Sequence, residues 1–399
     1  MTRFLFVFPP LVGHIGPALG VAEALSARGH DVAWVTHEAV IGDVLSDATV
    51  YPAGEEFLEY MVEYLPERDQ LKGLPAVKFL WEKVLVPMAL HTVGPVRTAV
   101  DEFGPDVIVA DQQAFAGAVV AVERGLPWAG SACGTAELQD PALVMPKVAA
   151  WFDRQIEHLL TELGHTGLIG TGFDPRFSPQ LLLQYSTLEL VGTVTRDVPG
   201  VAFVGPSLPR WAEETPFPWD WLDIHPRNVL VTMGTVSENV SDRFVGRVLE
   251  AVDGQSYGVI LVAPPGKFTD VPANVLKVDF VPQLSLLPHL DAIVFHGGHN
   301  TLVGALSHGV PVVCAPIRDD EPILADQVSR AGAGIRVNHN RGRAEDIAAA
   351  LAAVLEEPSY REAAARIQDS FAKAGGPPLA AELLEGLVGH PTPFAKHLT

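Results

Sequence analysis

Short apolar runs alternate with longer amphipathic segments from the start of the chain. The run Phe4–Phe8 is followed by a helical pattern at 17–30 and by a second apolar run at 31–36. Runs of this length indicate buried strands, and the segment between them is long enough for a helix. Pro17 suits a first helical position and Gly29 a helix end. The pattern therefore predicts a βαβ unit.

The same alternation continues to about residue 375. Further apolar runs read PDVIVAD, LPWAGSA, NVLVTMGT, GVILVAP, VLKVDF, AIVFHGG, VPVVCAPI and GIRV. Helical patterns separate most of them, and strands that alternate with helices form parallel sheets through right-handed crossovers. We therefore predict an α/β fold with parallel sheets and helices on both faces.

The chain is long enough for two domains. Its 399 residues exceed the roughly 100–200 residues of a typical domain. A Pro- and Trp-rich segment without periodicity interrupts the alternation and is a predicted linker. The predicted division is a Rossmann-like domain at 1–206, the linker at 207–227, a second Rossmann-like domain at 228–375, and a C-terminal helix and tail at 376–399. A return of this tail to the first domain is one option.

Doubly wound sheets bind their ligands at the carboxyl ends of the strands. If the two domains face each other, one cleft can hold two substrates. A transfer between two bound ligands is then the expected chemistry.

Two longer segments, 54–100 and 136–182, interrupt the first half and are rich in large apolar side chains. We interpret them as insertions that shape a pocket for an apolar small molecule. The alternative for each side chain is packing in the core. The candidate pocket residues are Phe57, Tyr60, Phe79, Trp81, Met88 and Trp151.

Charge and composition exclude several classes of protein. The formal net charge of -21 argues against binding to nucleic acid or to an anionic membrane surface. Cys133 and Cys314 are the only cysteines, which excludes a disulfide framework. The first apolar run is too short for a signal segment or a membrane helix. We expect a cytoplasmic monomer or homodimer without integral membrane association.

A glycine-containing turn in the second half has the character of an anion site. The run AIVF ends at His296, two glycines follow, and a helix begins near Asn300. Free amides at a helix start favour an anion, and Asn300 and Thr301 add donors. A diphosphate fits there without a lysine. An ordinary strand–turn–helix is the alternative, and no carboxylate or cysteine stands near His296 at metal-ligand spacing, so we expect no metal.

A possible general base follows the first strand. His14 stands in the turn after that strand, and Asp111 ends the run DVIVA in the same predicted sheet. Both lie at carboxyl ends of parallel strands, so contact is expected. An imidazole oriented by a carboxylate can take a proton from an attacking hydroxyl. The helix start should disfavour the imidazolium and keep the base neutral. The alternative for His14 is a structural hydrogen bond.

The segment from Phe280 to Val328 resembles the signature of the UDP-glycosyltransferase superfamily. The opening FPPLVGHIGPALGVAEALSARGHDV and the run PDVIVAD are also similar to bacterial natural-product members, which act on macrolide- and antibiotic-type acceptors. The resemblance implies a GT-B fold, with two facing Rossmann-like domains. It implies an inverting transferase that moves a sugar from a UDP- or dTDP-sugar to a hydroxyl of a hydrophobic acceptor bound by the first domain. His14 would be the base, Asp111 its partner, and no metal or other cofactor would be needed.

The resemblance also assigns the donor site. The nucleobase would stack on Phe280 and meet the backbone near Val281 and Gln283, and Asp320 would contact the donor sugar, with Glu321 beside it. The diphosphate ligands carried over from the signature and from the MGT loop are His296, Gly298, Asn300, Thr301 and Thr235.

Two positions depart from the signature. Gly304 replaces a glutamate that binds the ribose hydroxyls, and Glu321 replaces a glutamine. The first departure admits a dTDP-sugar, whose ribose lacks one hydroxyl. The second removes a hydrogen-bond donor and leaves a carboxylate able to pair with an amino group.

Three alternatives compete with an active transferase. A NAD-dependent oxidoreductase is disfavoured because GHIGPALG lacks the dinucleotide fingerprint and the second strand ends in His37, not in an acidic residue. An epimerase or phosphorylase of the same fold would lack the PQ and HGG motifs. A catalytically silent relative that binds an aglycone or a partner enzyme remains the alternative, supported by Gly304 and Glu321.

Overall fold

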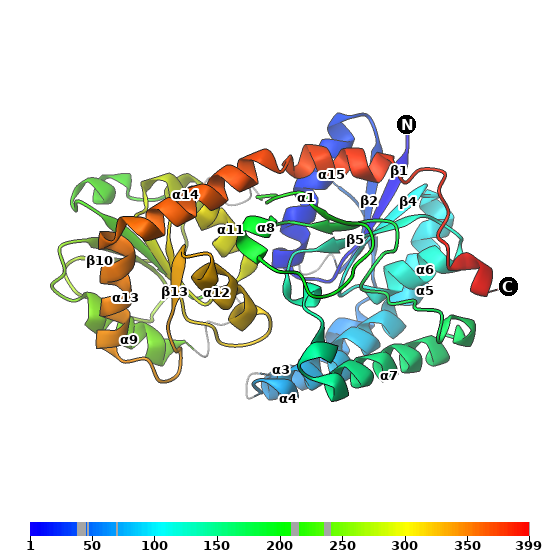
Figure 1. The fold of residues 1–399 in the computed structure, drawn as a ribbon, viewed down its shortest axis with the longest axis horizontal. Helices are drawn as coiled ribbons and strands as arrows, with labels where there is room; N and C mark the ends of the chain where they lie inside the picture. Colours follow the sequence, from blue (N-terminus) through cyan, green and yellow to red (C-terminus); the bar gives the residue numbers. More distant parts are fainter. Residues whose placement is uncertain (38–44, 46–47, 69–70, 209–214, 235–240, 399) are drawn as a thin grey trace. The chain divides into compact units, whose positions relative to one another are not determined.

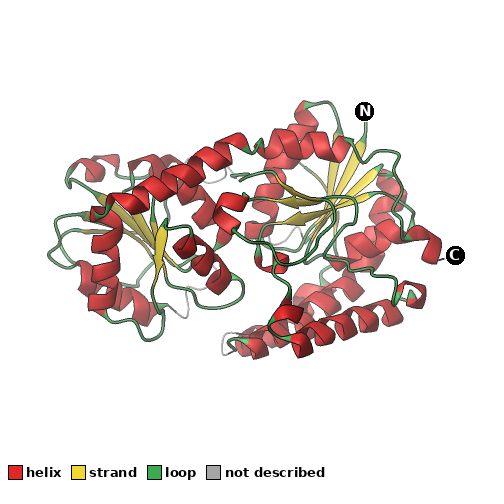
Figure 2. Cartoon of the chain, viewed as in Figure 1, coloured by secondary structure: helices red, strands yellow, loops and turns green. Residues whose placement is uncertain are grey.

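The computed structural model describes residues 1–37, 45, 48–68, 71–208, 215–234 and 241–398 (Figures 1 and 2). The chain divides into two compact units. The first comprises Met1–Tyr185, Val194–Pro209 and Ala374–Thr399, and the second comprises Ser186–Thr193 and Arg210–Lys373. Residues 186–193, placed in the first domain by the sequence analysis, thus group with the second unit.

The first unit contains a seven-stranded sheet. Its order is β3-β2-β1-β4-β5-β6-β7, and every neighbouring pair is parallel. The strands are β1 (Arg3–Val7), β2 (Asp31–Thr36), β3 (Thr49–Pro52), β4 (Val107–Asp111), β5 (Trp128–Ala132), β6 (Leu182–Gln184) and β7 (Val201–Phe203).

Helices cover both faces of this sheet. They are α1 (Val12–Ala27), α3 (Glu56–Arg68), α4 (Leu74–Phe79), the π-helix η1 (Leu80–Leu85), α5 (Val86–Phe103), α6 (Phe115–Glu123), α7 (Pro146–Glu162) and α15 (Gly376–Glu385). Side chains alternate between faces along β1: Phe4 and Phe6 pack in the core beneath α1 and α15, and Leu5 packs in the core beneath α5 and α6. Burial of both faces explains the continuous apolar run.

Helix α1 starts earlier than the sequence predicted. The backbone N–H groups of His14 and Ile15 both donate to the carbonyl of Leu11, at 2.9 and 3.1 Å, and close a turn before Pro17. Pro17 is therefore inside the helix, and His14 lies in its first turn.

The second unit contains a six-stranded parallel sheet in the order β10-β9-β8-β11-β12-β13. The strands are β8 (Asn228–Thr232), β9 (Gly258–Val262), β10 (Val275–Val278), β11 (Ala292–Phe295), β12 (Val312–Cys314) and β13 (Gly334–Arg336). The helices are α8 (Leu188–Val191), α9 (Asp242–Val252), α10 (Gln283–Leu286), α11 (His299–Ser307), α12 (Glu321–Arg330), α13 (Ala344–Glu356) and α14 (Pro358–Lys373).

Short 3-10 turns complete the described elements: η2 (Ala136–Leu138), η3 (Pro141–Leu143), η4 (Thr166–Leu168), η5 (Trp219–Asp223), η7 (Leu287–His289) and η8 (Ala395–His397). Helices α9 and α13 pack together on one face of the second sheet, and their residues Phe244 and Ile347 belong to the same apolar core as Val229 of β8. No helix in the described ranges is long and apolar enough to cross a membrane.

Each sheet has one point where the strand order reverses. In the first unit β1 and β4 are neighbours, and in the second β8 and β11 are neighbours. In doubly wound sheets ligands bind beside such a point, at the carboxyl ends of the strands. The predicted α/β class with two parallel, Rossmann-like sheets is confirmed.

Candidate functional site

His14 and Asp111 meet at the reversal point of the first sheet. His14 follows β1, Asp111 ends β4, and the His14 Nδ1 atom lies 2.9 Å from Oδ2 of Asp111. The other carboxylate oxygen of Asp111 accepts the backbone N–H of Gln113 at 2.8 Å. Because both carboxylate oxygens are engaged and the Asp111 side chain is only 1% exposed, it holds the imidazole in one orientation.

The surroundings of His14 favour its charged form. Burial lowers the pKa of His14, but the nearby Asp111 and Cys133 outweigh burial and raise this pKa well above 6.5. The expectation that the helix start keeps His14 neutral is therefore wrong. A helix terminus contributes about 0.3–1 kcal/mol, which is less than a buried carboxylate in contact with the ring.

Cys133 joins this pair from a third strand. It follows β5, the neighbour of β4, and one ligand atom from each of His14, Asp111 and Cys133 lies within 4.8 Å of the others. Cys133 was not among the residues predicted for the site. Its place directly after a strand of the same sheet is the signal that could have found it.

His296 occupies the reversal point of the second sheet. It follows β11, and its ring packs against the backbone of Gly234, after β8, and of Gly298. A Cβ atom at either glycine would come within 2.5 Å of the ring, so both positions require glycine. Gly234 and Gly297 also have positive φ angles of 68° and 101°. Thr235, the predicted ligand after Gly234, lies outside the described residues.

The imidazole of His296 is neutral over the physiological pH range. Its side chain is 14% exposed, and within the described part of the chain its Nδ1 atom has no hydrogen-bond partner. Burial lowers the pKa of His296 to about 4, and the positive charges of Arg318 and His339 contribute. A neutral imidazole can donate one hydrogen bond to an anion without carrying charge.

The start of α11 lies beside this ring. Gly298 is its N-cap and has no side chain to bond the first-turn amides, and Asn300 and Thr301 are partly exposed in that turn. The first N–H groups of a helix have no partner within the helix. The structure thus brings His296, Gly298, Asn300 and Thr301 together around a helix start suited to an anion.

Glu321 lies against His296 and is not a free carboxylate. Its Oε2 atom accepts the backbone N–H groups of Ile317 at 2.6 Å and Arg318 at 3.0 Å, and its Oε1 atom lies 4.0 Å from Nε2 of His296. Burial raises the pKa of Glu321 to about 7, although the two backbone hydrogen bonds oppose this. Asp320, the N-cap of α12, is partly exposed beside it.

Protonation of Glu321 should make stability pH-dependent. Because its pKa is higher in the folded than in the unfolded chain, this contribution to stability is lost as the pH rises through about 7. At pH 8.5 we expect Glu321→Gln to melt at a higher temperature than wild type, with an unfolding free energy larger by about 1–3 kcal/mol. At pH 5 the two proteins should melt at nearly the same temperature. Thermal melts at both pH values test this. The control is Glu362→Gln, which replaces an exposed glutamate of α14. An equal difference in melting temperature between Glu321→Gln and wild type at both pH values would contradict the prediction.

The predicted nucleobase residues lie together before α10. Phe280 is 49% exposed, so its ring is available for stacking, whereas Val281 is buried. Gln283 begins α10, and its Nε2 atom lies 3.8 Å from the place that a Cβ of Gly304 would take. Gln283 is thus adjacent to the position where the signature has its ribose-binding glutamate.

Most of the predicted acceptor-binding side chains belong to the core. Phe57, Phe79, Trp81 and Met88 are 2–5% exposed, and only Tyr60 and Trp151 are partly exposed. The aromatic rings of Phe57 and Tyr60 lie 6.2 Å apart, as do those of Trp81 and Trp151 at 6.1 Å. In this structure packing accounts for the four buried residues.

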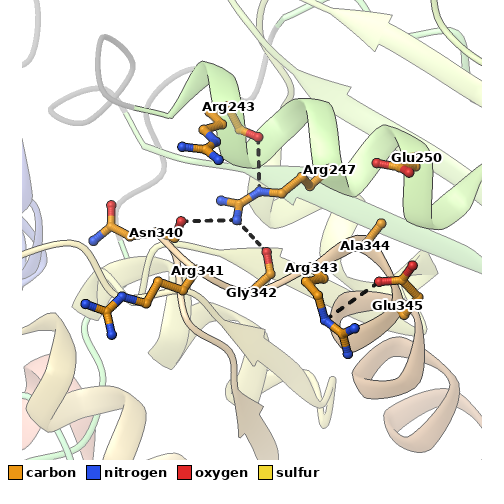
Figure 3. A pocket seen from close by; sticks show the side chains of 9 residues that line it. All are labelled: Arg243, Arg247, Glu250, Asn340, Arg341, Gly342, Arg343, Ala344 and Glu345. Atoms are coloured by element: carbon orange, nitrogen blue, oxygen red, sulfur yellow. Dashed lines mark hydrogen bonds and ion pairs between the residues drawn. The ribbon is translucent and has the colours of Figure 1, made fainter.

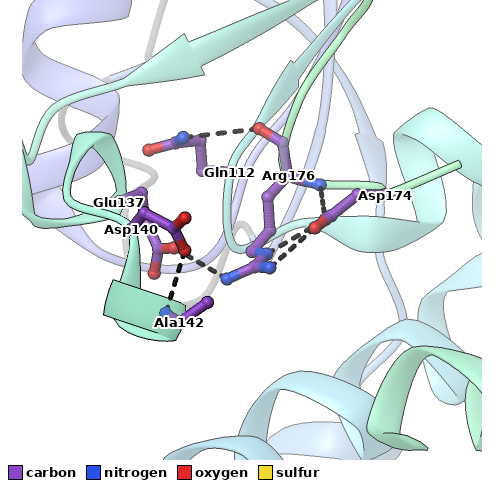
Figure 4. A network of polar contacts seen from close by, with 6 residues as sticks. All are labelled: Gln112, Glu137, Asp140, Ala142, Asp174 and Arg176. Atoms are coloured by element: carbon purple, nitrogen blue, oxygen red, sulfur yellow. Dashed lines mark hydrogen bonds and ion pairs between the residues drawn. The ribbon is translucent and has the colours of Figure 1, made fainter. Parts of the chain in front are cut away.

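A buried arginine, Arg176, joins this aromatic cluster to the loop after β4. Figure 4 shows its polar contacts with Asp174, Glu137 and Gln112. The guanidinium of Arg176 donates to Asp174 at 3.0 and 2.6 Å and to Glu137 at 2.7 Å. It lies 5.0 Å from the centre of the Trp81 ring, and the Arg176 carbonyl accepts the side-chain amide of Gln112, the residue after Asp111. Arg176 was not among the predicted site residues, because it stands in the insertion 136–182, where only large apolar side chains were candidates.

A basic pocket of about 640 Å³ lies between α9 and the start of α13 (Figure 3). Its lining includes four arginines, but Arg247 donates to the carbonyls of His339, Asn340 and Gly342, and Arg343 pairs with Asp346. None of the predicted site residues is among its lining residues. We interpret these two arginines as fixing the loop before α13.

Comparisons with known proteins agree with this architecture. The family described as "Erythromycin biosynthesis protein CIII-like, C-terminal domain" matches residues 250–387, which include the whole segment from Phe280 to Val328. The chain is 29% identical to 4'-demethylrebeccamycin synthase from Lentzea aerocolonigenes, over 97% of this chain and 100% of that protein. It is also 29% identical to demethyllactenocin mycarosyltransferase from Streptomyces fradiae, over 97% of this chain and 87% of that protein.

Solved structures share the fold. The calicheamicin glycosyltransferase CalG4 superposes with a TM-score of 0.77 at 23% identity, covering 98% of this chain and 99% of that one. The spinosyn rhamnosyltransferase SpnG, complexed with thymidine diphosphate, superposes with a TM-score of 0.73 at 21% identity, covering 96% and 100%.

Proposed function

We propose that this chain, which is related to bacterial natural-product glycosyltransferases of the GT-B fold, is itself a glycosyltransferase. It moves a sugar from a UDP- or dTDP-sugar to a hydroxyl of a hydrophobic small molecule. The observation that carries this proposal is the contact between His14 and Asp111 at the reversal point of the first sheet. A catalytically silent relative would have no need of this pair.

In the proposed reaction His14 acts as the general base. Neutral His14 takes the proton of the acceptor hydroxyl while its oxygen forms a bond to the anomeric carbon. The bond from that carbon to the diphosphate breaks, and the nucleoside diphosphate leaves with the electron pair. Asp111 orients the imidazole and stabilises the imidazolium that forms. A single displacement of this kind inverts the anomeric configuration.

The departing diphosphate is assigned to the second unit. The start of α11 and the neutral imidazole of His296 offer hydrogen-bond donors where negative charge develops. The thymidine diphosphate complexed with SpnG supports a donor of the same class for this chain. Glu321 would face this charge in its protonated form, because its pKa already lies near 7.

A donor and acceptor screen tests the proposed function. Purified protein is offered UDP- and dTDP-sugars with phenolic and macrolide acceptors, and products are detected by mass spectrometry. We expect a mass increase of one sugar residue that depends on the donor and disappears in His14→Ala. Binding of nucleotide and acceptor without any transfer would instead favour the silent relative.

Replacing His296 should separate diphosphate binding from nucleoside binding. We expect His296→Ala to weaken UDP or dTDP binding by roughly 10- to 100-fold, the value of one hydrogen bond to a charged group, with little effect on uridine or thymidine. Calorimetry on the two pairs of ligands measures this. His308→Ala, at the far end of α11, is the control. Equal losses for nucleotide and nucleoside would place the diphosphate elsewhere.

A carboxylate at position 304 should shift the choice of nucleotide towards UDP. The added Cβ would lie 3.3 Å from Cδ1 of Leu287, so this flexible end must move by a few tenths of an ångström. With that adjustment Gly304→Glu can accept both ribose hydroxyls, and we expect the UDP-to-dTDP ratio of kcat/KM to rise by roughly 10-fold or more. Gly304→Ala supplies the same Cβ without the carboxylate and should leave the ratio unchanged. An unmoved ratio in Gly304→Glu would mean that another residue contacts the ribose.

A further inference from the structure

Three side chains able to bind a metal converge at the carboxyl ends of three neighbouring strands. His14 follows β1, Asp111 ends β4 and Cys133 follows β5, and these strands are adjacent in the order β1-β4-β5. One ligand atom from each residue lies within 4.8 Å of the others. In the described ranges this is the only group of three or more His, Cys, Asp or Glu side chains with such spacing.

We propose that His14, Asp111 and Cys133 bind a thiophilic divalent cation of the Zn²⁺ class, and that the bound cation inhibits the enzyme. The binding site follows from the cluster alone. The inhibition rests on the proposed function. It arises because the bound metal coordinates the His14 imidazole, which would otherwise take up the proton of the acceptor hydroxyl.

The chemistry of the three ligands selects the class of cation. Imidazole nitrogen, carboxylate oxygen and thiolate sulfur together suit Zn²⁺, which binds them at about 2.0–2.3 Å. Mg²⁺ and Ca²⁺ take six or more oxygen ligands and do not match a set with sulfur. Ligands around a tetrahedral Zn²⁺ stand about 3.3–3.8 Å apart. Because no two of the three ligand atoms are more than 4.8 Å apart, binding needs changes in their separations of no more than about 1.5 Å.

The site is both held in place and accessible. Asp111 is 1% exposed and fixed by the backbone N–H of Gln113, so one ligand is already oriented. The His14 side chain is 17% exposed and Cys133 is half-buried, which leaves a path from solvent. The formal net charge of -21 raises the local concentration of cations around the protein.

Binding exchanges protons for the metal and involves no oxidation or reduction. The thiol proton of Cys133 and the proton on the coordinating nitrogen of His14 go to solvent, and the Asp111 carboxylate bonds the metal in place of the imidazole N–H. A chelator reverses the exchange. While the metal is bound, His14 cannot accept a proton, so sugar transfer stops.

Metal binding is measured directly on the full chain after removal of any affinity tag. Zn²⁺ is titrated against a chromophoric chelator, and Co²⁺ serves as the spectroscopic probe because thiolate ligation gives a charge-transfer band. We expect one equivalent of Zn²⁺ and a thiolate band in wild type. Cys133→Ser should lose the band and bind Zn²⁺ at least ~10-fold more weakly.

The second cysteine provides a matched control. Cys314 is fully buried in β12 of the other unit, so Cys314→Ser should bind Zn²⁺ as wild type does. Asp111→Asn tests the site independently of the thiol and should also weaken binding. Wild-type affinity in Cys133→Ser, or a Co²⁺ spectrum without the thiolate band, would overturn the proposed site.

Inhibition is measured on the same variants. We expect Zn²⁺ to inhibit sugar transfer reversibly, Mg²⁺ to have no such effect, and Cys133→Ser to resist Zn²⁺ relative to its own metal-free rate. Tight binding at the cluster without inhibition would overturn the inhibitory role. If no donor supports transfer at all, the proposed function fails, while the titrations still decide the metal site.

Discussion

His14→Ala is expected to lower kcat by at least ~10²-fold, which is the usual contribution of a general base. The affinity for nucleoside diphosphate should not change, because the diphosphate site is assigned to the second unit. Single-turnover kinetics with EDTA present, together with calorimetry on the nucleotide, measure the two quantities separately. His158→Ala is a matched control, since His158 is an exposed histidine of α7 outside the cluster. Near-normal turnover in His14→Ala would falsify the assignment of the base.

The pH dependence of the reaction gives a second test of the same pair. The pKa of His14 is raised above 6.5, and only the neutral imidazole accepts a proton, so kcat/KM should fall as the pH drops through a value above 6.5. Asp111→Asn removes a carboxylate that raises this pKa. We therefore expect this variant to shift the acid limb to lower pH and to reduce turnover. An acid limb at the same pH in Asp111→Asn and wild type would show that Asp111 does not raise the pKa of the group that titrates.

The parts of the fold that follow from local pattern were predictable. Phe4 and Leu5 pack on opposite faces of β1, and a strand buried on both faces is visible as a continuous apolar run. The contact of His14 with Asp111 followed from the same pattern, because carboxyl ends of parallel strands meet at one edge. The start of α1 was misplaced because Pro17 resembles a first helical residue, whereas hydrogen bonds to Leu11 close an earlier turn.

The remaining features depend on packing between segments distant in sequence. Cys133 and Cys314 both stand in apolar segments, and only the strand order places the first beside His14. Large apolar residues of the insertions suit a pocket or a core equally well, so the burial of Phe57 and Trp81 could not be predicted from composition. The role of Arg176 depends on its contacts with two carboxylates and with Trp81, and these contacts are visible only in the folded chain.

Arg176→Met should destabilise the first unit more than removal of an exposed charge such as that of Arg124. The substitution keeps an unbranched side chain against Trp81 and Phe152 but leaves Asp174 and Glu137 without their cation. Removing one partner of a buried ion pair costs about 3–5 kcal/mol. Since the Asp174 and Glu137 side chains are 20% and 36% exposed, we expect a smaller loss than this range, about 2–3 kcal/mol.

Thermal unfolding measures this loss, and a second substitution identifies its cause. A loss of this size lowers the melting temperature by about 4–12 °C for a unit of this length. Arg124→Met is the control: its partner Asp101 is exposed, and such pairs contribute about 0–1 kcal/mol. Adding Asp174→Asn to Arg176→Met should recover part of the loss, because it removes one of the two carboxylates left unpaired.

The same variant should also affect function selectively. Through Gln112 and Trp81, Arg176 links the loop after Asp111 to the aromatic helices of the first unit. Acting as a positioning residue, it should raise the acceptor KM when replaced, while the donor KM stays near wild type. Arg176→Lys retains the positive charge and should restore part of both stability and acceptor KM. A melting temperature equal to that of Arg124→Met, or equal changes in both KM values, would show that Arg176 does not hold the acceptor side in place.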